Sequence, residues 1–133
     1  MKYKIAFVCV GNSCRSQMAE GFAKEYASDI FAVYSAGTDP SEEVKPNAVK
    51  VMEEVGIDIS NQVPKLLKEI PDELDILITM GCGVKCPYIP CKMREDWDLD
   101  DPDSQPIEFF RETRDIIETK VKELIEKARE GKI

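Results

Sequence analysis

Apolar runs of strand length recur along the chain and are separated by stretches of mixed polarity. Three of these runs, at residues 4–9, 31–37 and 74–80, are apolar enough to be buried strands. A shorter run at residues 92–96 predicts a fourth strand. The segment around its start, residues 81–94, is rich in Gly, Pro and Cys and is typical of a loop.

Between these runs, apolar residues recur at helical spacing. The first helix is expected to begin at residues 14–16. A second begins at Pro46, because proline is favoured in the first turn of a helix, and it stops at Gly56. The pattern also predicts a short helical turn at residues 65–70 and a long C-terminal helix over residues 107–128.

The alternation of strands and helices favours an α/β fold with a parallel sheet that is covered on both faces. In such sheets, ligands bind beyond the carboxyl ends of the strands. The loops that follow the first and third strands should therefore lie at the same edge of the sheet. The sequence contains no repeat, low-complexity tract or linker, so we expect one domain over residues 1–133.

The composition limits the classes of function. A net charge of −8 disfavours a broad nucleic-acid-binding surface. The N-terminal apolar run is too short to span a membrane, and we expect a cytoplasmic monomer. The chain has five cysteines and no histidine, which excludes Cys-His and Ser-His-Asp catalysis and every metal site that uses histidine. A reducing compartment also argues against static disulfides.

One loop, residues 9–16, carries a pattern suited to holding an anion. It enters a helix N-terminus, where several backbone N–H groups point at one spot. Gly11 and Asn12 permit a tight turn, and Arg15 adds a planar guanidinium that fits a tetrahedral oxyanion. The nucleotide-binding pattern G-x4-G-K-[ST] is absent. The predicted oxyanion-binding residues are Val10, Gly11, Asn12, Ser13, Cys14, Arg15 and Ser16.

The same loop contains a candidate nucleophile, Cys9. A helix N-terminus and a nearby cation favour the thiolate form of a cysteine, which activates it without histidine. Ser16 is placed to donate a hydrogen bond to the sulfur. The alternative is that Cys9 is a buried core residue. For Cys14, packing in the loop and a redox role remain equally open.

Residues 9–16 resemble the phosphate-binding loop of the low-molecular-weight protein tyrosine phosphatases, and more closely that of their redox relatives, the thioredoxin-coupled arsenate reductases. In the phosphatases a proline usually follows the Arg-Ser pair, whereas Gln17 follows it here, as in the reductases. The runs SAGT, VMEEVGIDISNQ and REDWDLDDP also resemble the reductases, so the resemblance spans about residues 4–127. It implies a three-layer sandwich with a four-stranded parallel sheet. For this chain we expect no cofactor and no metal.

A C-x5-R site also needs a proton donor for the leaving oxygen. Residues 96–104 carry five aspartates, which on their own are typical of a solvated acidic turn. The resemblance implies that the aspartate before proline, Asp101, is the donor. Asp100 and Asp103 are its rivals, because the sequence does not say which carboxylate points inward. Trp97 is expected to pack beneath this segment.

Cys82, Cys86 and Cys91 form a second group of cysteines. Their surroundings of Gly, Pro and Lys disfavour buried bystanders. A zinc site is disfavoured because C-x3-C-x4-C is a poor zinc spacing and Cys9 or an acid would have to complete it. A redox relay is the favoured interpretation. Arsenate copies the shape of phosphate, but As(V) accepts two electrons, which two thiols supply when they become a disulfide.

The resemblance implies a sequence of steps for that relay. Cys9 attacks arsenate with Asp101 as the acid, Cys82 then attacks the Cys9 sulfur, and arsenite leaves. Cys86 next attacks Cys82, and a thioredoxin-like partner reduces the Cys82–Cys86 disulfide. Phosphate or sulfate would occupy the loop as mimics of arsenate.

The chain departs from the family pattern in its cysteine spacing. Cys82 and Cys86 enclose three residues, fewer than in the best-known thioredoxin-coupled members. Cys91 is an additional cysteine, which could replace Cys86 as the resolving residue or pair with it. The sequence leaves open whether thioredoxin or glutaredoxin is the electron donor.

A second departure concerns a monovalent cation that the family can hold near the anion loop. The resemblance implies ligands at Asn12, Glu20 and Ser35, but the position of a further acidic ligand holds Lys65. We therefore expect the cation site to be weakened or lost, with the lysine ammonium in its place.

The alternative function is that of a low-molecular-weight protein tyrosine phosphatase that hydrolyses phosphate monoesters. The anion loop and the acid serve both reactions, and a weak phosphatase side activity is expected. The phosphatases often carry paired tyrosines soon after the acid. In this chain no tyrosine follows Tyr88, and Phe109 and Phe110 lie further along. A non-enzymatic binding module that uses thiols is a third hypothesis.

Overall fold

A four-stranded, all-parallel sheet forms the centre of the computed structural model, which describes residues 2–81 and 89–133. The strand order is β2-β1-β3-β4. The strands are, in chain order, β1 (Tyr3–Cys9), β2 (Phe31–Gly37), β3 (Leu74–Thr79) and β4 (Cys91–Asp96). All four predicted strands are present. The loop expected over residues 81–94 is wrong in its last part, because the chain from Cys91 onward pairs with β3.

The described residues form three α-helices and one short 3₁₀ helix. The α-helices are α1 (Arg15–Ala27), α2 (Pro46–Glu53) and α3 (Ile107–Arg129), and the 3₁₀ helix η1 spans Leu67–Glu69. Each agrees with the sequence pattern, and Gly56 adopts a positive φ of 82° in the turn that follows α2. Within residues 2–81 and 89–133, no helix combines the length and apolar character needed to cross a bilayer.

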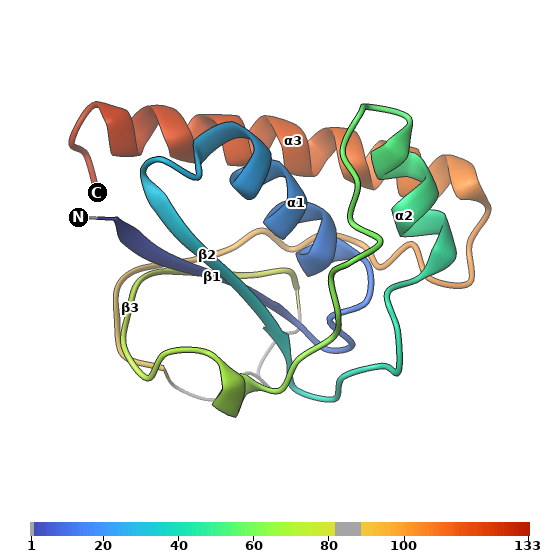
Figure 1. Cartoon of the computed structure of the whole chain (residues 1–133), viewed down its shortest axis with the longest axis horizontal. Helices are drawn as coiled ribbons and strands as arrows, with labels where there is room; N and C mark the ends of the chain where they lie inside the picture. The colour runs from blue at the N-terminus through green and yellow to red at the C-terminus, as the bar shows by residue number, and fades with distance from the viewer. Residues whose placement is uncertain (1, 82–88) are drawn as a thin grey trace.

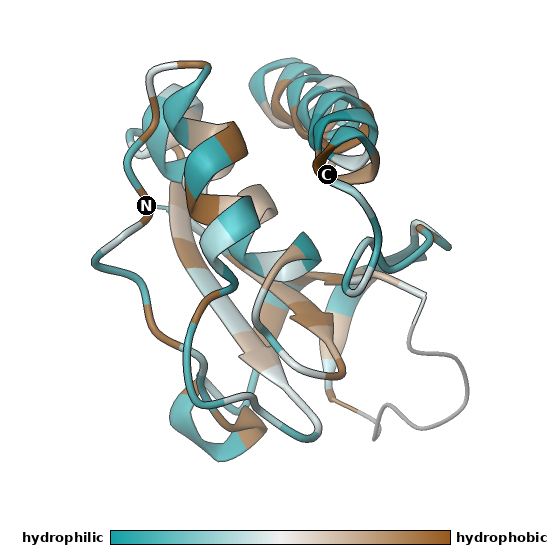
Figure 2. Cartoon of the chain, turned by 90° about the vertical axis from the view of Figure 1, so that its right-hand side faces the viewer, coloured by the Kyte–Doolittle hydropathy of each residue, from teal (hydrophilic) through white to brown (hydrophobic). Residues whose placement is uncertain are grey.

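The elements are arranged in three layers (Figure 1). The three α-helices lie on one side of the sheet and share a core with alternate strand residues such as Ile5 and Phe7. On the other side, Ala6 and Val8 of β1 belong to a smaller core that Leu67 of η1 packs against. Figure 2 shows apolar residues concentrated in the strands and hydrophilic colour on the outer helix surfaces. The predicted sandwich with a parallel sheet is confirmed.

The register of the sheet brings the predicted functional segments to one edge. Cys9, the last residue of β1, pairs with Gly37 at the end of β2. On the other side of β1, Val8 pairs with Thr79 at the end of β3. The first cysteine loop and the segment after β3 therefore begin next to each other, as expected for the carboxyl edge of a parallel sheet. Trp97 follows β4 at this edge, is buried, and contacts Phe7.

An ion-pair cluster ties α2 to α3. Glu54, just after α2, accepts hydrogen bonds from both Arg111 and Arg114 of α3, the shortest at 2.7 Å from Arg111 Nη2. The hydrogen bonds from Arg111 first, and those from Arg114 second, lower the pKa of the Glu54 carboxyl to about 2. The folded state therefore binds this proton less readily than the unfolded chain does.

This cluster predicts an acid-dependent stability. Because the pKa of Glu54 is lowered on folding, its contribution is fully present above the ordinary value near 4.5 and is lost as the pH falls towards about 2. In urea unfolding, Glu54→Gln should lower the free energy of unfolding at neutral pH, and the difference from the wild type should shrink below pH 4.5. The matched control is the neighbouring Glu53→Gln, on an exposed side chain. An equal pH dependence for the two variants would contradict this account.

Candidate active site

The loop between β1 and α1 is held open from outside by the segment that follows β2. The carbonyl oxygens of Val10, Gly11 and Ser13 accept hydrogen bonds from the N–H groups of Asp39, Ser41 and Lys45, at 2.8 to 2.9 Å. In a trans peptide the N–H points away from the carbonyl oxygen. The N–H groups that follow these carbonyls are thus turned towards the interior of the loop.

The inward face of the loop offers several N–H donors at once. The N–H of Asn12 donates to Cys9 Sγ at 3.2 Å, and Asn12 itself has a φ of +49°, which reverses the chain direction. The N–H groups of Gly11, Ser13 and Cys14 have no acceptor in the described parts of the chain. Converging N–H groups at a helix N-terminus are suited to an anion, and anion binding by this loop stays a prediction from the sequence.

Cys9 lies at the floor of this loop. It is buried, and its sulfur lies 2.9 Å from Ser16 Oγ. Asn12 Nδ2 donates to the same Ser16 oxygen at 2.7 Å, which leaves the hydroxyl proton of Ser16 free to point at sulfur. Two polar groups, the Asn12 backbone N–H and the Ser16 hydroxyl, therefore lie within hydrogen-bond distance of the Cys9 sulfur.

Arg15 is locked in place at the same edge of the sheet. Its Nη1 donates to the carbonyl oxygens of Met80, after β3, and of Leu99, in the acidic segment. Its Nε is buried and has no hydrogen-bond partner in the part of the chain that the structure describes. A buried guanidinium N–H without an acceptor is costly, and an oxyanion in the loop would satisfy it.

Among the candidate acids, Asp101 is the one that reaches the loop. Its Oδ2 lies 3.6 Å from Arg15 Nη2, and its Oδ1 accepts from Cys14 Sγ at 3.4 Å. Asp103 instead pairs with Lys45 at 3.5 Å, and among the described residues no hydrogen bond or ion pair joins Asp100 to the loop. The carboxylate that the resemblance singled out is thus the one beside Cys14 and Arg15.

Cys14 is a buried neutral thiol. Burial, and to a lesser degree the negative charge of Asp101, raises the pKa of Cys14 to about 12. Two cysteines of one loop therefore face opposite environments, since donors surround the sulfur of Cys9 and a carboxylate faces that of Cys14. This contrast argues against Cys14 as a second nucleophile.

The second group of cysteines lies only partly within the residues that the structure describes. Cys82 and Cys86 lie outside the described residues. Cys91 begins β4 and pairs with Leu74, whereas Asp96, five residues later, pairs with Thr79 at the edge that carries Cys9. At about 3.3 Å per residue, Cys91 lies roughly 16 Å along the sheet from that edge. Cys9 and Cys91 therefore cannot bind one metal ion together, which removes that form of the zinc alternative.

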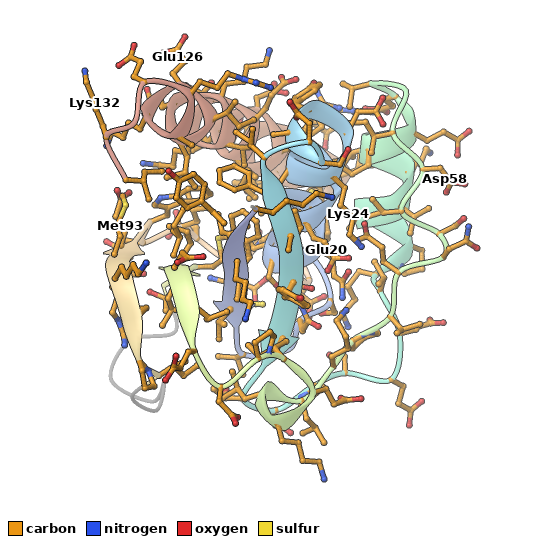
Figure 3. The ribbon with its side chains drawn as sticks, turned by 60° about the vertical axis from the view of Figure 1, so that its left-hand side comes forward. Glu20, Lys24, Asp58, Met93, Glu126 and Lys132 are labelled. Atoms are coloured by element: carbon orange, nitrogen blue, oxygen red, sulfur yellow. The ribbon has the colours of Figure 1, made fainter. Side chains whose placement is uncertain are left out.

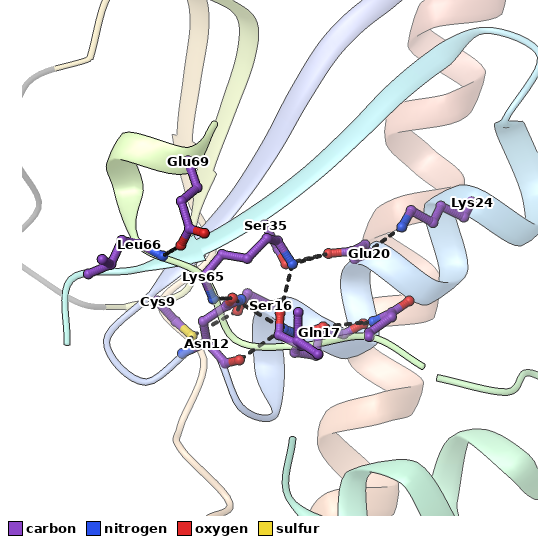
Figure 4. Close-up of polar contacts among 12 residues, drawn as sticks. Cys9, Asn12, Ser16, Gln17, Glu20, Lys24, Ser35, Lys65, Leu66 and Glu69 are labelled. Carbon is purple, nitrogen blue, oxygen red and sulfur yellow. Dashed lines mark hydrogen bonds and ion pairs between the residues drawn. The ribbon is translucent and has the colours of Figure 1, made fainter. Parts of the chain in front are cut away.

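A polar network behind the loop was not predicted from the sequence (Figure 4). Gln17 is fully buried, and its Nε2 lies within 3.1 Å of the backbone oxygen and Oδ1 of Asn12 and of the Val63 carbonyl. Gln62 in turn donates to Gln17 Oε1 at 2.8 Å. This network joins the segment after α2 to the residue that turns the anion loop. Sequence reasoning noted Gln17 only as a family marker, because an exposed and a buried glutamine in a helix look alike in sequence.

Lys65 occupies the place expected for it near Glu20. Its ammonium lies 3.6 Å from Glu20 Oε1, and Ser35 Oγ donates to the same carboxylate oxygen. The other Glu20 oxygen pairs with Lys24 at 2.6 Å on the face of α1 beside β2 (Figure 3). The buried Glu20 carboxylate is thus partnered by two ammonium groups. Asn12, a third proposed ligand, has its Oδ1 occupied by the Lys65 N–H and Gln17.

Comparisons with known proteins agree with this geometry. A family model described as low molecular weight phosphotyrosine protein phosphatase matches residues 4–132. A glutaredoxin arsenate reductase from Synechocystis is 46% identical over 128 residues, which cover 93% of this chain and 97% of that protein. A solved arsenate reductase in the phosphate-binding state superimposes with a TM-score of 0.87 at 46% identity, covering 96% and 98% of the two chains.

A more distant structure belongs to the same group. It is a thioredoxin-dependent arsenate reductase from Corynebacterium glutamicum, with a TM-score of 0.82 at 33% identity over 98% of this chain and 63% of that one. The fold defines an α/β protein of the low-molecular-weight phosphatase type. The chain belongs to the low-molecular-weight phosphotyrosine protein phosphatase family. The resemblance to its arsenate-reducing branch that the sequence motifs suggested is confirmed.

The contact between Lys65 and Glu20 leads to a prediction about potassium. A site with a dissociation constant of ~1 mM would stabilise the protein by about 2.7 kcal/mol at ~100 mM potassium. We expect a much smaller effect, because the Lys65 ammonium already neutralises Glu20. Thermal unfolding in potassium chloride, compared with choline chloride at equal ionic strength, measures it. A large potassium-specific rise in stability or activity would contradict this expectation.

Proposed function

We propose that this protein reduces arsenate to arsenite, with Cys9 as the nucleophile of a C-x5-R oxyanion loop. One observation carries the proposal: a buried cysteine sulfur faces hydrogen-bond donors on the floor of a loop whose arginine has an unsatisfied, buried Nε. A nucleophilic sulfur next to the loop N–H groups and the Arg15 guanidinium is suited to attack a tetrahedral oxyanion that those donors hold. The names of the relatives, which are arsenate reductases, support arsenate as that oxyanion.

The first step is a displacement at arsenic without electron transfer. The Cys9 thiolate forms a sulfur–arsenic bond while one arsenic–oxygen bond breaks. The departing hydroxide takes a proton from Asp101 and leaves as water. Arg15 and the loop N–H groups hold the remaining oxygens and stabilise their charge. Arsenic stays in the +5 state in this adduct.

The second step supplies the electrons. The Cys82 thiolate attacks the Cys9 sulfur, the sulfur–arsenic bond breaks, and its electron pair stays with arsenic. Arsenic leaves as As(III), in arsenite, and a Cys9–Cys82 disulfide remains. Cys86 then attacks Cys82, which frees the Cys9 thiolate and leaves a Cys82–Cys86 disulfide.

The cycle closes when an external dithiol reduces that disulfide. We propose a thioredoxin-like protein as this reductant, which the name of the Corynebacterium relative supports. The name of the Synechocystis relative points instead to glutaredoxin. Either dithiol would restore both thiols, so the two donors are compared directly in the assay below.

A second candidate function is hydrolysis of phosphate monoesters, as a side activity or as the main reaction. The oxyanion loop and Asp101 would serve it unchanged. A cleft of about 350 Å³ beside the acid, lined by Asp101, Phe109 and Thr113 among others, would receive the organic group of an ester. Phosphate is not reduced, so this reaction has no use for Cys82 or Cys86.

The cysteine relay predicts how two reactions separate in one variant. Cys82→Ser should abolish arsenate-dependent oxidation of reduced thioredoxin or glutaredoxin, because the electron pair then has no source. Any hydrolysis of an aryl phosphate should be unaffected by the same change. Cys9→Ser should abolish both activities. If the wild type hydrolyses aryl phosphate but never oxidises either dithiol, the protein is a phosphatase.

The position of Cys91 predicts which cysteine resolves the disulfide. Because Cys91 starts β4 at the edge of the sheet opposite Cys9, Cys86→Ser should stop steady-state turnover after one equivalent of arsenite, and Cys91→Ser should sustain it. Rapid-quench arsenite measurement followed by steady-state thioredoxin oxidation distinguishes the two. Continued turnover by Cys86→Ser would show that Cys91 resolves the disulfide.

A further inference from the structure

We propose that Cys14 is a positioning residue: its thiol holds Oδ1 of Asp101, so that the transferable proton is carried by Oδ2, on the side of Arg15. The inference rests on the proposed role of Asp101 as the acid. It assigns to Cys14 a task that concerns neither oxidation nor nucleophilic attack.

The contacts of Asp101 are unequal at its two oxygens. Oδ1 accepts hydrogen bonds from Cys14 Sγ at 3.4 Å and from the Asp103 N–H at 3.0 Å. Oδ2 has a single described neighbour of opposite charge, Arg15 Nη2 at 3.6 Å. One oxygen is thus anchored, and the other faces the guanidinium whose Nε is free to hold the oxyanion.

These contacts decide where a proton on Asp101 resides. A carboxyl oxygen that accepts from two donors has its lone pairs engaged, so a proton on that oxygen would collide with one of them. The proton of the acid form therefore lies on Oδ2. A general acid must present its proton within hydrogen-bond reach of the leaving oxygen, and Oδ2 is the oxygen on that side.

The anchor matters because Asp101 is otherwise loosely held. Its side chain is 51% exposed, on a segment without regular secondary structure. A free aspartate at such a site would sample several rotamers and present either oxygen. Cys14, by contrast, is 4% exposed and fixed next to the first residue of α1.

The protonation state of Cys14 suits this task. Burial and the neighbouring carboxylate raise the pKa of Cys14 to about 12, so the sulfur keeps its proton and remains a donor throughout the neutral range. A thiolate at this place would repel Asp101. In the displacement at arsenic, the Cys9–arsenic bond forms, the arsenic–oxygen bond breaks, and the proton on Asp101 Oδ2 leaves with that oxygen as water. Cys14 keeps its own proton.

The test is a double-mutant cycle between Cys14 and Asp101. Cys14→Ala should lower kcat for arsenate by roughly 5- to 50-fold, a part of the ~10²–10⁴-fold that general acid catalysis contributes. In an Asp101→Asn background the same change should lower kcat no further. Cys14→Ser retains a donor and should recover most of the rate. Both Cys14 variants keep the backbone N–H of this residue, so their dissociation constants for phosphate should change far less than kcat does.

Controls separate positioning from folding. Urea unfolding checks that each variant is folded, and Cys14→Val, which fills the site without a donor, replaces the alanine variant if that one does not fold. The proposal is overturned if Cys14→Ala lowers kcat by the same factor with and without Asp101, if Cys14→Ser is as slow as Cys14→Ala, or if neither change affects kcat.

The same cycle also separates this inference from the proposed function. If the wild type fails to reduce arsenate but hydrolyses aryl phosphate, the proposed main function is wrong. The cycle on aryl phosphate then still decides the role of Cys14, because Asp101 would protonate that leaving oxygen as well.

Discussion

The functional site depends on three hydrogen bonds that run away from it. The carbonyls of Val10, Gly11 and Ser13 accept from the segment after β2, and this turns the opposite faces of their peptide groups inward. Without these outer bonds the carbonyl oxygens would be free to face the anion position and would repel it. The positive φ of Asn12 and the hydrogen bonds of Gln17 and Gln62 also hold the loop in this conformation. The conformation proposed to hold an anion therefore depends on the segment that binds the carbonyl groups of the loop.

This arrangement also bears on how a protein with a negative net charge would bind the anion proposed as its substrate. With a net charge of −8, the chain as a whole repels an oxyanion. The field at the loop is local, since backbone N–H groups, the start of α1 and one buried guanidinium all act within a few ångströms. The nearest carboxylate, Asp101, lies beside Arg15, and the buried carboxylate of Glu20 is paired with two lysines. Both of these carboxylates are thus paired with basic side chains.

Much of this could be predicted from the sequence, and the reasons are local. The strands and helices could be predicted from the spacing of apolar residues. The loop of residues 9–16 could be predicted because Gly11 and Asn12 permit a tight turn and Arg15 supplies a positive charge. The start of β4 at Cys91 was missed, because the exposed edge strand alternates in burial and its first residues sit in a segment rich in Gly, Pro and Cys. The hydrogen bond between Gln62 and the buried Gln17 was missed because a contact across 45 residues leaves no trace in either local pattern. The unequal contacts of the two Asp101 oxygens depend on distances, which no sequence motif contains.

Gly37 gives the site its narrowest tolerance. It is the last residue of β2. In the structure a methyl group added at this position would come within 2.5 Å of the Val10 carbonyl oxygen and within 3.0 Å of Asn12 Cβ. Even alanine would push the anion loop away from its neighbouring strand, and with it the sulfur of Cys9 from its donors. The position of the loop that carries Cys9 therefore depends on the absence of a side chain on the adjacent strand.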